Sequence, residues 1–141
     1  MPISGDDKLL ARLRRAGRVG QAMDRWANES AEVIAKEARD LVDEGGIPSP
    51  NHIPSKPGQP PNTDTGRLVA NTVAIDLPDP GHAAAISHAL SDDGYSYSLG
   101  LEFGNSRVAE RPFMRPATSN KRKAILDAAR KAVDDVVKGR G

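Results

Sequence analysis

The 141-residue sequence has no cysteine, few aromatic residues and no long apolar run. The lack of cysteine excludes disulfides and thiolate metal sites, and it favours a reducing compartment. Aromatic residues make up only 4% of the chain, so its core must rest on Ala, Val, Leu and Ile. A core that light often gains stability from a partner subunit. No apolar run approaches the roughly 20 residues that a membrane-spanning helix requires. We therefore expect a soluble protein made in a cytoplasm, with one domain over residues 1–141 and no membrane partner.

The charge is nearly balanced, at +1 overall, but it is unevenly distributed along the chain. Residues 1–44 carry a net charge of −1, residues 45–104 carry −4 and residues 105–141 carry +6. A chain with an acidic middle and a basic end can join head to tail with copies of itself, or present one sign of charge to an inner channel. The simpler alternative is that the C-terminal charges only solvate the face of a helix.

Two segments have the periodicity of long helices. Apolar or small residues recur at steps of three to five positions through residues 6–44, which places them along one face. At 1.5 Å per residue this helix is about 57 Å long, so we expect part of it to pack against another subunit. A similar pattern predicts a C-terminal helix over residues 118–138, capped by Thr118 or Ser119 and packed on a sheet.

Between these helices the sequence predicts a proline-rich segment, a small sheet and a loop. Six prolines in residues 45–62 exclude regular structure, and we expect a loop or arm that orders on contact with a partner. Residues 63–104 predict a turn with a short helix at 63–70, then an antiparallel meander of three or four strands. A docking loop follows over residues 105–117. The strands expected are residues 71–77, 82–90 and 95–103, and the fold class is α+β.

No set of residues in the chain has the spacing of a catalytic or metal site. His82 and His88 would lie about 20 Å apart on one strand, and His52 lies in the proline-rich segment, so the three cannot share a metal ion. The carboxylates, glycines and serines match no metal-binding, phosphate-binding or nucleophile-elbow pattern. We therefore expect neither enzymatic activity nor a cofactor.

Three short segments combine residues that fix the backbone with residues suited to binding. Gly66 permits a sharp turn beside Arg67, whose planar guanidinium suits carboxylates and carbonyls. Phe103 is expected to reach the core from the end of the last strand. Two prolines rigidify a segment in which Phe113 and Met114 can plug an apolar pocket, and such preorganisation favours docking. The candidate docking residues are Asp64, Thr65, Gly66, Arg67, Leu68, Glu102, Phe103, Gly104, Arg111, Pro112, Phe113, Met114, Arg115 and Pro116.

A cluster of cations near the start of the predicted C-terminal helix is the candidate surface for nonspecific contact with DNA phosphates. Its members are Lys121, Arg122, Lys123, Arg130 and Lys131. The alternative is that these cations serve a local acidic partner, because positive charge near a helix N-terminus opposes the helix dipole. No reading-helix motif accompanies them, so sequence-specific binding is the weaker hypothesis.

The same segments, taken in order, resemble a known family. Pro57–Pro61 (PGQPP), Asp64–Leu68 (DTGRL), a tyrosine-rich strand ending in Leu101–Gly104 (LEFG) and Arg111–Ala117 (RPFMRPA) are similar to boxes in the neck and tail-completion proteins of long-tailed bacteriophages and related prophages. The boxes of the family correspond to residues 62–68, 97–104 and 111–117. Each box alone is weak, but the three in this order at suitable spacing are fairly specific. The resemblance does not extend to the N-terminal helix.

The resemblance implies a structural virion protein of the head–tail junction with an α+β fold. In that family a ring of identical subunits, expected to be hexameric, joins the capsid connector to the tail tube and lets DNA pass. Head-completion (stopper) and tail-terminator proteins are the implied neighbours, in a virion assembled in the bacterial cytoplasm. Asn62 and Thr63 stand where the family commonly has Pro-Val, which leaves the subtype open, and a tail-terminator ring is the alternative. A small DNA-binding regulator is the alternative from another class.

Overall fold

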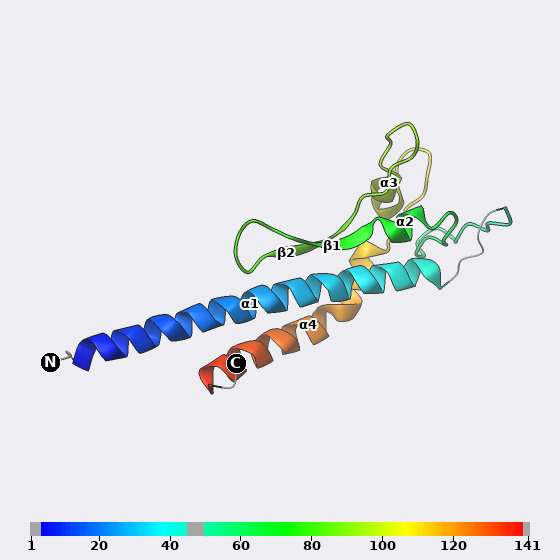
Figure 1. Cartoon of the computed structure of the whole chain (residues 1–141). Coiled ribbons are helices and arrows are strands. Elements are labelled where there is room, and N and C mark those ends of the chain that lie inside the picture. Colours follow the sequence, from blue (N-terminus) through cyan, green and yellow to red (C-terminus); the bar gives the residue numbers. More distant parts are fainter. Residues whose placement is uncertain (1–3, 45–49, 140–141) are drawn as a thin grey trace.

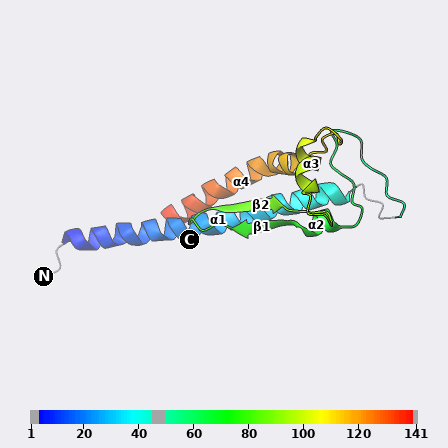
Figure 2. The ribbon, with the colours of Figure 1, turned by 90° about the horizontal axis from the view of Figure 1, so that it is seen from above.

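The computed structural model describes residues 4–44 and 50–139 and has an elongated α+β fold (Figure 1). Its elements in chain order are the helix α1 (Ser4–Asp43), the short helix α2 (Arg67–Ala70), the strands β1 (Thr72–Asp76) and β2 (Ala83–Ser87), the helix α3 (Tyr97–Phe103) and the helix α4 (Met114–Val137). α1 is the central element, because the hairpin of β1 and β2 and the helix α4 both pack against it. Figure 2 shows the hairpin and α4 running along α1 from a second direction.

The helix predicted over residues 6–44 is confirmed as α1, which is continuous over 40 residues. At 1.5 Å per residue, a helix of that length extends about 60 Å. Its C-terminal half carries a stripe of buried small residues at helical spacing: Ala27, Ala31, Ala35, Ala38 and Val42. Because these side chains are short, the neighbouring elements can approach the backbone of α1 closely along this half.

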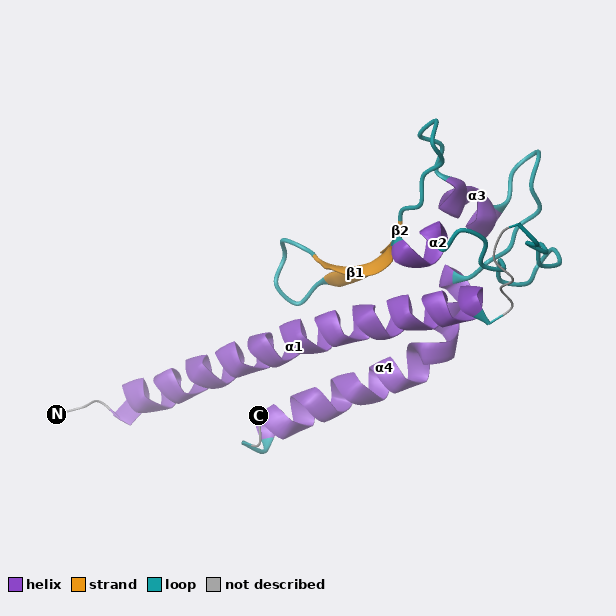
Figure 3. Cartoon of the chain, turned by 45° about the vertical axis from the view of Figure 1, so that its right-hand side comes forward, coloured by secondary structure: helices purple, strands orange, loops and turns teal. Residues whose placement is uncertain are grey.

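The two strands form an antiparallel hairpin (Figure 3). Its register pairs Thr72 with Ser87. The strands predicted at residues 71–77 and 82–90 are therefore confirmed, with boundaries that differ by a few residues. The hairpin packs on α1 through the side that buries Thr72. The guanidinium of Arg39 in α1 donates a hydrogen bond to the Thr72 carbonyl at 2.8 Å, which fixes the start of β1 against the helix.

The third predicted strand, residues 95–103, is wrong, because this segment forms α3 and the sheet in the described part of the chain has two strands. An isolated bridge between Leu90 and Ser96 is what the described residues retain of the expected pairing. Tertiary contacts override the alternating pattern that indicated a strand. The hydroxyl of Ser98, which is buried, donates to the Ser87 carbonyl at 3.1 Å, so a polar residue of this segment faces the interior.

The C-terminal helix is confirmed, but it begins earlier than expected and packs against α1 rather than on the sheet. It starts at Met114 with Phe113 as its N-cap residue, so Thr118 and Ser119 lie inside the helix and do not cap it. Pro116 is tolerated in the first turn because the N–H that proline lacks would have no helical partner there.

Polar contacts join α1 to α4 in addition to apolar packing. The indole Nε1 of Trp26 in α1 donates to the carbonyl of Ile125 in α4 at 2.8 Å. Nearer the start of α4, the side chains of Asn120 and Lys121 reach the carboxylate of Glu37 at 3.1 and 3.4 Å. In Figures 1 and 3 α1 lies between the hairpin and α4, which explains why α4 covers α1 instead of the sheet.

The connecting segments agree in part with the sequence analysis. The short helix expected in residues 63–70 is α2, and it follows Gly66, whose φ of 79° lies in the left-handed region that favours glycine. Residues 50–62 of the proline-rich segment form an irregular loop, whereas residues 45–49 of that segment lie outside the described residues.

The main core cluster lies where the C-terminal end of α1 meets α2 and the start of α4. Its buried members are Ala38, Val42, Leu68, Ala89, Phe113 and Ala117. Phe113 is the largest of them and is fully buried. The expected reliance on small aliphatic residues therefore holds for this cluster, with one aromatic ring at its centre.

Candidate docking site

The segments singled out in the sequence meet at one end of the molecule, opposite the N-terminus of α1 (Figure 1). We call this end the corner and define it as residues 50–70 and 88–117. It contains α2, α3, the described part of the proline-rich segment and the first turn of α4. Side-chain hydrogen bonds hold these pieces together and determine which of the predicted docking residues are accessible.

The carboxylate of Glu102 is the most highly connected group in the corner. Its side chain is only 6% exposed, and it accepts hydrogen bonds from the backbone N–H groups of Phe113, Met114 and Arg115 at 2.8, 3.0 and 2.9 Å. These donors belong to the first turn of α4, where N–H groups have no partner within the helix. Glu102 therefore caps α4 from a neighbouring helix, at the end where the helix dipole favours negative charge.

Arg115 also binds the Glu102 carboxylate, through its side chain. Its guanidinium donates to the Glu102 carboxylate at 2.9 Å and to the Glu102 carbonyl at 2.6 Å, and it forms a further ion pair with Glu110 at 3.1 Å. It also lies over the ring of Phe103, 5.0 Å from the centroid. Arg115 is half-exposed, so it links the buried carboxylate to the surface of the corner.

The hydrogen bonds to Glu102 outweigh the effect of its burial. Burial is the largest single influence and raises the pKa of the carboxyl group, because it disfavours the charged form. The three backbone donors and the Arg115 guanidinium act in the opposite direction. Together they hold the pKa of Glu102 below its usual value, so the group is a carboxylate at neutral pH.

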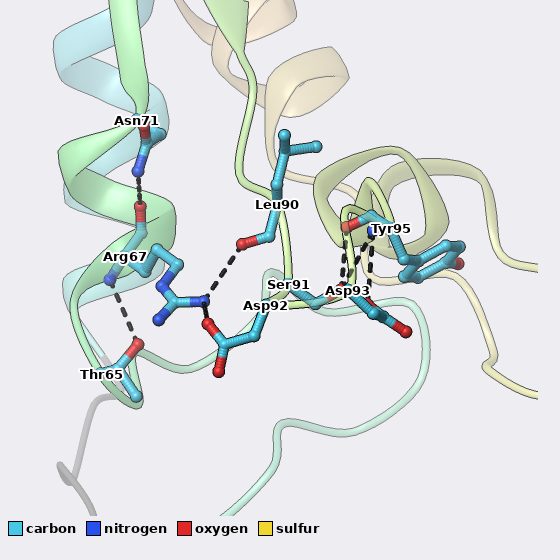
Figure 4. Close-up of polar contacts among 8 residues, drawn as sticks. All are labelled: Thr65, Arg67, Asn71, Leu90, Ser91, Asp92, Asp93 and Tyr95. Atoms are coloured by element: carbon cyan, nitrogen blue, oxygen red, sulfur yellow. Dashed lines mark hydrogen bonds and ion pairs between the residues drawn. The ribbon is translucent and has the colours of Figure 1, made fainter.

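A second group of contacts fixes α2 to the segment after β2 (Figure 4). The Arg67 guanidinium donates to the Leu90 carbonyl at 3.2 Å and to the Asp92 carboxylate at 3.1 Å. In the adjoining turn, hydrogen bonds from the Ser91 hydroxyl and the Tyr95 N–H lower the pKa of Asp93. These groups are exposed, so their contribution to stability is small, and their main effect is to orient the turn.

Arg111 joins the proline-rich segment to the loop before α4. Its Nε donates to the Ser55 carbonyl at 3.1 Å, and its backbone N–H donates to the Leu101 carbonyl at 2.6 Å. A backbone hydrogen bond of 2.9 Å from Gly58 to Glu110 adds a second connection between the two loops. The described part of the segment that we expected to form an arm therefore contacts the loop before α4 in its own chain.

The structure divides the predicted docking residues into buried and exposed groups. Leu68, Glu102 and Phe113 are buried, so their side chains serve the fold of this chain, although Phe113 was expected to plug a separate pocket. Phe103 shows the opposite difference: it was expected to reach the core, and it is 60% exposed. Leu99, one turn earlier on α3, is 61% exposed, so α3 presents two neighbouring apolar side chains at the surface.

Two open grooves border the corner. Residues of the segment 64–68 and of the loop 107–111 line the first groove, so two of the predicted segments share it. The second lies between β2, α3 and the start of α4, and Leu99 and Phe103 line it together with Met114. Both grooves are lined in part by residues of the predicted docking set.

The predicted DNA-facing cations are mostly paired within the chain. Lys121 pairs with Glu37, while Arg130 and Lys131 pair with aspartates one turn away on α4. Arg122 and Lys123 have no ion pair among the described residues. This pairing favours the alternative that we weighed for the cluster, in which most of these cations serve local acidic partners.

Other classes of site find little support in the described residues. Residues 4–44 and 50–139 contain no group of three or more histidine or acidic side chains arranged to hold a metal ion. None of the helices described is both long and apolar enough to cross a membrane. Comparison with known protein families, with curated proteins and with solved structures finds no match to this chain.

Proposed function

We propose that the chain is a structural subunit of the head–tail junction of a long-tailed bacteriophage or prophage, in the neck or tail-completion class. In this proposal identical subunits form a ring, hexameric like the tail, that joins the capsid connector to the tail tube and lets DNA pass. The order in which the sequence boxes occur along the chain suggests the neck or tail-completion class. The observation that carries the proposal further is that residues of these separate boxes bind one another, with Glu102 of one box capping the helix that begins within another.

A head–tail subunit needs a surface whose shape is fixed before its partner arrives, because preorganisation lowers the entropic cost of binding. The corner meets this requirement. Its loops are linked by Arg111 and its helices by Glu102, while Leu99 and Phe103 remain exposed on α3. We propose that these two apolar side chains dock on a neighbouring head-completion or tail-terminator protein.

The elongated shape of the chain fits a subunit with neighbours at both ends. The corner lies at one end of α1, and the N-terminal part of α1 extends at the other end (Figure 1). Contact with DNA inside the ring is nonspecific in this proposal, and Arg122 and Lys123 on α4 are the cations of the predicted cluster that have no ion pair among the described residues.

The proposal is tested by removing the gene from its source phage or prophage and examining the induced particles by electron microscopy. We expect DNA-filled heads and separate tails, with joined virions restored when the gene is supplied in trans. Joined, infectious virions in the deletion would contradict the proposal. Overlong tail tubes would instead favour the tail-terminator alternative, because a terminator stops growth of the tube.

Complementation of the same deletion tests the role of the corner. Supplying the double variant Leu99→Asp/Phe103→Asp should leave heads and tails separate, because a charge at each exposed apolar position disfavours an apolar interface. The matched control is Leu126→Asp, which changes an exposed leucine of α4 outside both grooves. Normal joining with the double variant would show that α3 is not the docking surface.

The DNA-binding regulator is a separate hypothesis and has a separate test. A gel shift on random duplex DNA should show weak binding that disappears as salt rises, because only phosphate contacts contribute. Preference for one sequence over another at physiological salt would favour the regulator over a structural protein.

A further inference from the structure

The N-terminal part of α1 is exposed, and Arg18 at its end borders a groove shared with α4. We call residues 7–18 the overhang, and every one of them is exposed. Three of these residues are leucines, and Leu13 is 60% exposed. An exposed group of three leucines on one helix is a surface that a soluble protein normally covers with a partner.

The overhang separates its leucines from its positive charges. At about 100° per residue, Leu9, Leu10 and Leu13 fall within one arc of about 100° on the helix, and the cations fall outside that arc. The cations are Lys8, Arg12, Arg14, Arg15 and Arg18, against a single acidic residue, Asp7. None of these five cations has an ion pair among the described residues. The overhang is therefore a basic amphipathic helix with neither its charge nor its apolar face satisfied by the described part of the chain.

A surface of complementary character lies on the hairpin. Val73 and Ile75 of β1, with Leu77 just after it, are partly exposed, whereas the alternating residue Thr72 is buried on the side toward α1. We call Val73, Ile75 and Leu77 the hairpin face. Two exposed acidic residues belong to the same hairpin: Asp76, which alternates to the other side of β1 from Val73 and Ile75, and Asp79 in the turn. Residues 68–106 contain no lysine or arginine. A two-stranded hairpin packed on one side only is marginal by itself, so a second covering helix would stabilise it.

The overhang cannot cover the hairpin face of its own chain. α1 is one continuous helix, and its Asp24 carboxylate accepts a hydrogen bond from Gly81 in the turn of the hairpin. The overhang therefore begins where the hairpin ends and projects beyond it (Figure 1). A second copy of the chain is needed to bring the two surfaces together.

We propose that the overhang of one copy lies across the hairpin face of the next copy. This inference rests on the proposed ring and names the contact that would build it. The leucines pack on Val73 and Ile75, while the surrounding arginines face Asp76 and Asp79. Such a head-to-tail contact uses two different surfaces, so each copy offers one to each neighbour, and repetition builds a ring when the rotation between copies closes.

Charge selects this arrangement over a pairing of two overhangs. Two overhangs side by side would place a net charge of +4 against +4, counted over residues 7–18 of each copy, and like charges at such a contact oppose binding. The arrangement also revises the head-to-tail contact suggested by the sequence. In the head-to-tail contact suggested by the sequence, the basic surface was residues 105–141. However, Lys121, Arg130 and Lys131 of that region already form ion pairs within the chain.

Cysteine cross-linking tests the proposal, because the native chain has no cysteine. One preparation carries Leu13→Cys and another carries Ile75→Cys, and the two are mixed and treated with a short bismaleimide. We expect a cross-linked dimer in the mixture and not in either preparation alone. A second pair, Leu9→Cys with Val73→Cys, should behave in the same way, so the test does not depend on the folding of one variant. Leu126→Cys mixed with Ile75→Cys is the control and should give no dimer.

Charge reversal sharpens the same measurement. Arg12→Glu/Arg15→Glu in the overhang partner should lower the cross-link yield about tenfold, and Asp76→Lys/Asp79→Lys in the other partner should restore it. A yield that does not respond to these changes would contradict the assigned charge contacts.

Three results would overturn the proposal. A dimer formed by Leu13→Cys alone would show that overhangs pair with one another. Absence of a dimer in both mixtures would show that the two surfaces do not meet. Absence of a dimer together with loss of random-duplex binding in Arg12→Glu/Arg15→Glu would show that the overhang is a DNA surface. In each case the deletion phenotype would still decide the proposed function independently.

Discussion

The corner and the overhang contain similar residue types in opposite settings. In the corner, Leu68 and Phe113 are buried and the carboxylate of Glu102 has four nitrogen donors. In the overhang, Leu13 is exposed and Arg12 has no ion pair among the described residues. The polar and apolar groups of the corner make their contacts within the chain and so determine its fold. The overhang instead carries surfaces that only another molecule can cover or neutralise. Substitutions should therefore change stability in the corner and association in the overhang.

The largest expected effect is at Phe113. Phe113→Ala removes a fully buried ring from the core cluster and should lower the free energy of unfolding by about 3–5 kcal/mol. The matched control is Phe103→Ala, at a ring that is mostly exposed, which should cost less than about 1 kcal/mol. Guanidinium unfolding followed by circular dichroism measures both values. Similar losses for the two variants would contradict the division of the two phenylalanines between core and surface.

The next effect compares the two carboxylates that bind Arg115. Glu102→Gln removes a buried charge that accepts hydrogen bonds from the first turn of α4, and it should cost about 2–4 kcal/mol. Glu110→Gln removes an exposed partner and should cost less than about 1 kcal/mol. Equal and small losses in urea unfolding at pH 7 would show that the Glu102 cap is dispensable.

The pKa of Glu102 fixes how this difference depends on pH. Its pKa in the folded state lies below the ordinary value of 4.5. The carboxylate therefore stabilises the fold fully above the unfolded-state pKa, and this contribution is lost as the pH falls through the folded-state pKa. The difference between wild type and Glu102→Gln should accordingly shrink when unfolding is repeated well below pH 4.5. A constant difference across that range would mean that the charge of Glu102 is not responsible.

The parts of the fold that follow local patterns were predictable from the sequence. The long spacing pattern indicated α1, and alternation bounded by turn residues indicated β1 and β2. The pattern predicted these elements better than their buried faces, because Val73 and Ile75 of β1 are exposed whereas Thr72 is buried. The start of α4 was not predictable in the same way. Its cap is Glu102, a residue that is distant in sequence, and the hydroxyl groups of Thr118 and Ser119 were the local candidates.

The segment 95–103 shows why part of the site was missed. Its alternating residues fit a strand, yet in α3 the polar pair Ser98 and Glu102 faces inward and the apolar pair Leu99 and Phe103 faces solvent. Each pair is separated by four residues, which is the spacing of one helical face and the only local signal of this arrangement. An interpretation based on periodicity assumes that apolar residues face the interior, and this segment inverts that assumption. The inverted face is also the one that we propose for docking.

The smallest effect tests the N-terminal part of α1 with substitutions at Gly17, in the overhang, and at Gly20, just beyond it. Gly17→Ala and Gly20→Ala place a methyl group in open space, since a Cβ at either position would have no neighbouring atom within 4 Å, and each should favour the helix by up to about 1 kcal/mol. The expected readout is greater helicity by circular dichroism and slower amide exchange near the start of α1, with little change in global unfolding.

In the corner, Gly104→Ala should have the opposite effect on stability. Gly104 has a φ of 71°, and a Cβ there would lie 2.9 Å from the backbone nitrogen of Glu110, so that variant should unfold more easily. If Gly17→Ala and Gly20→Ala also lowered global stability, the start of α1 would be packed within its own chain, and the contrast between overhang and corner would fail.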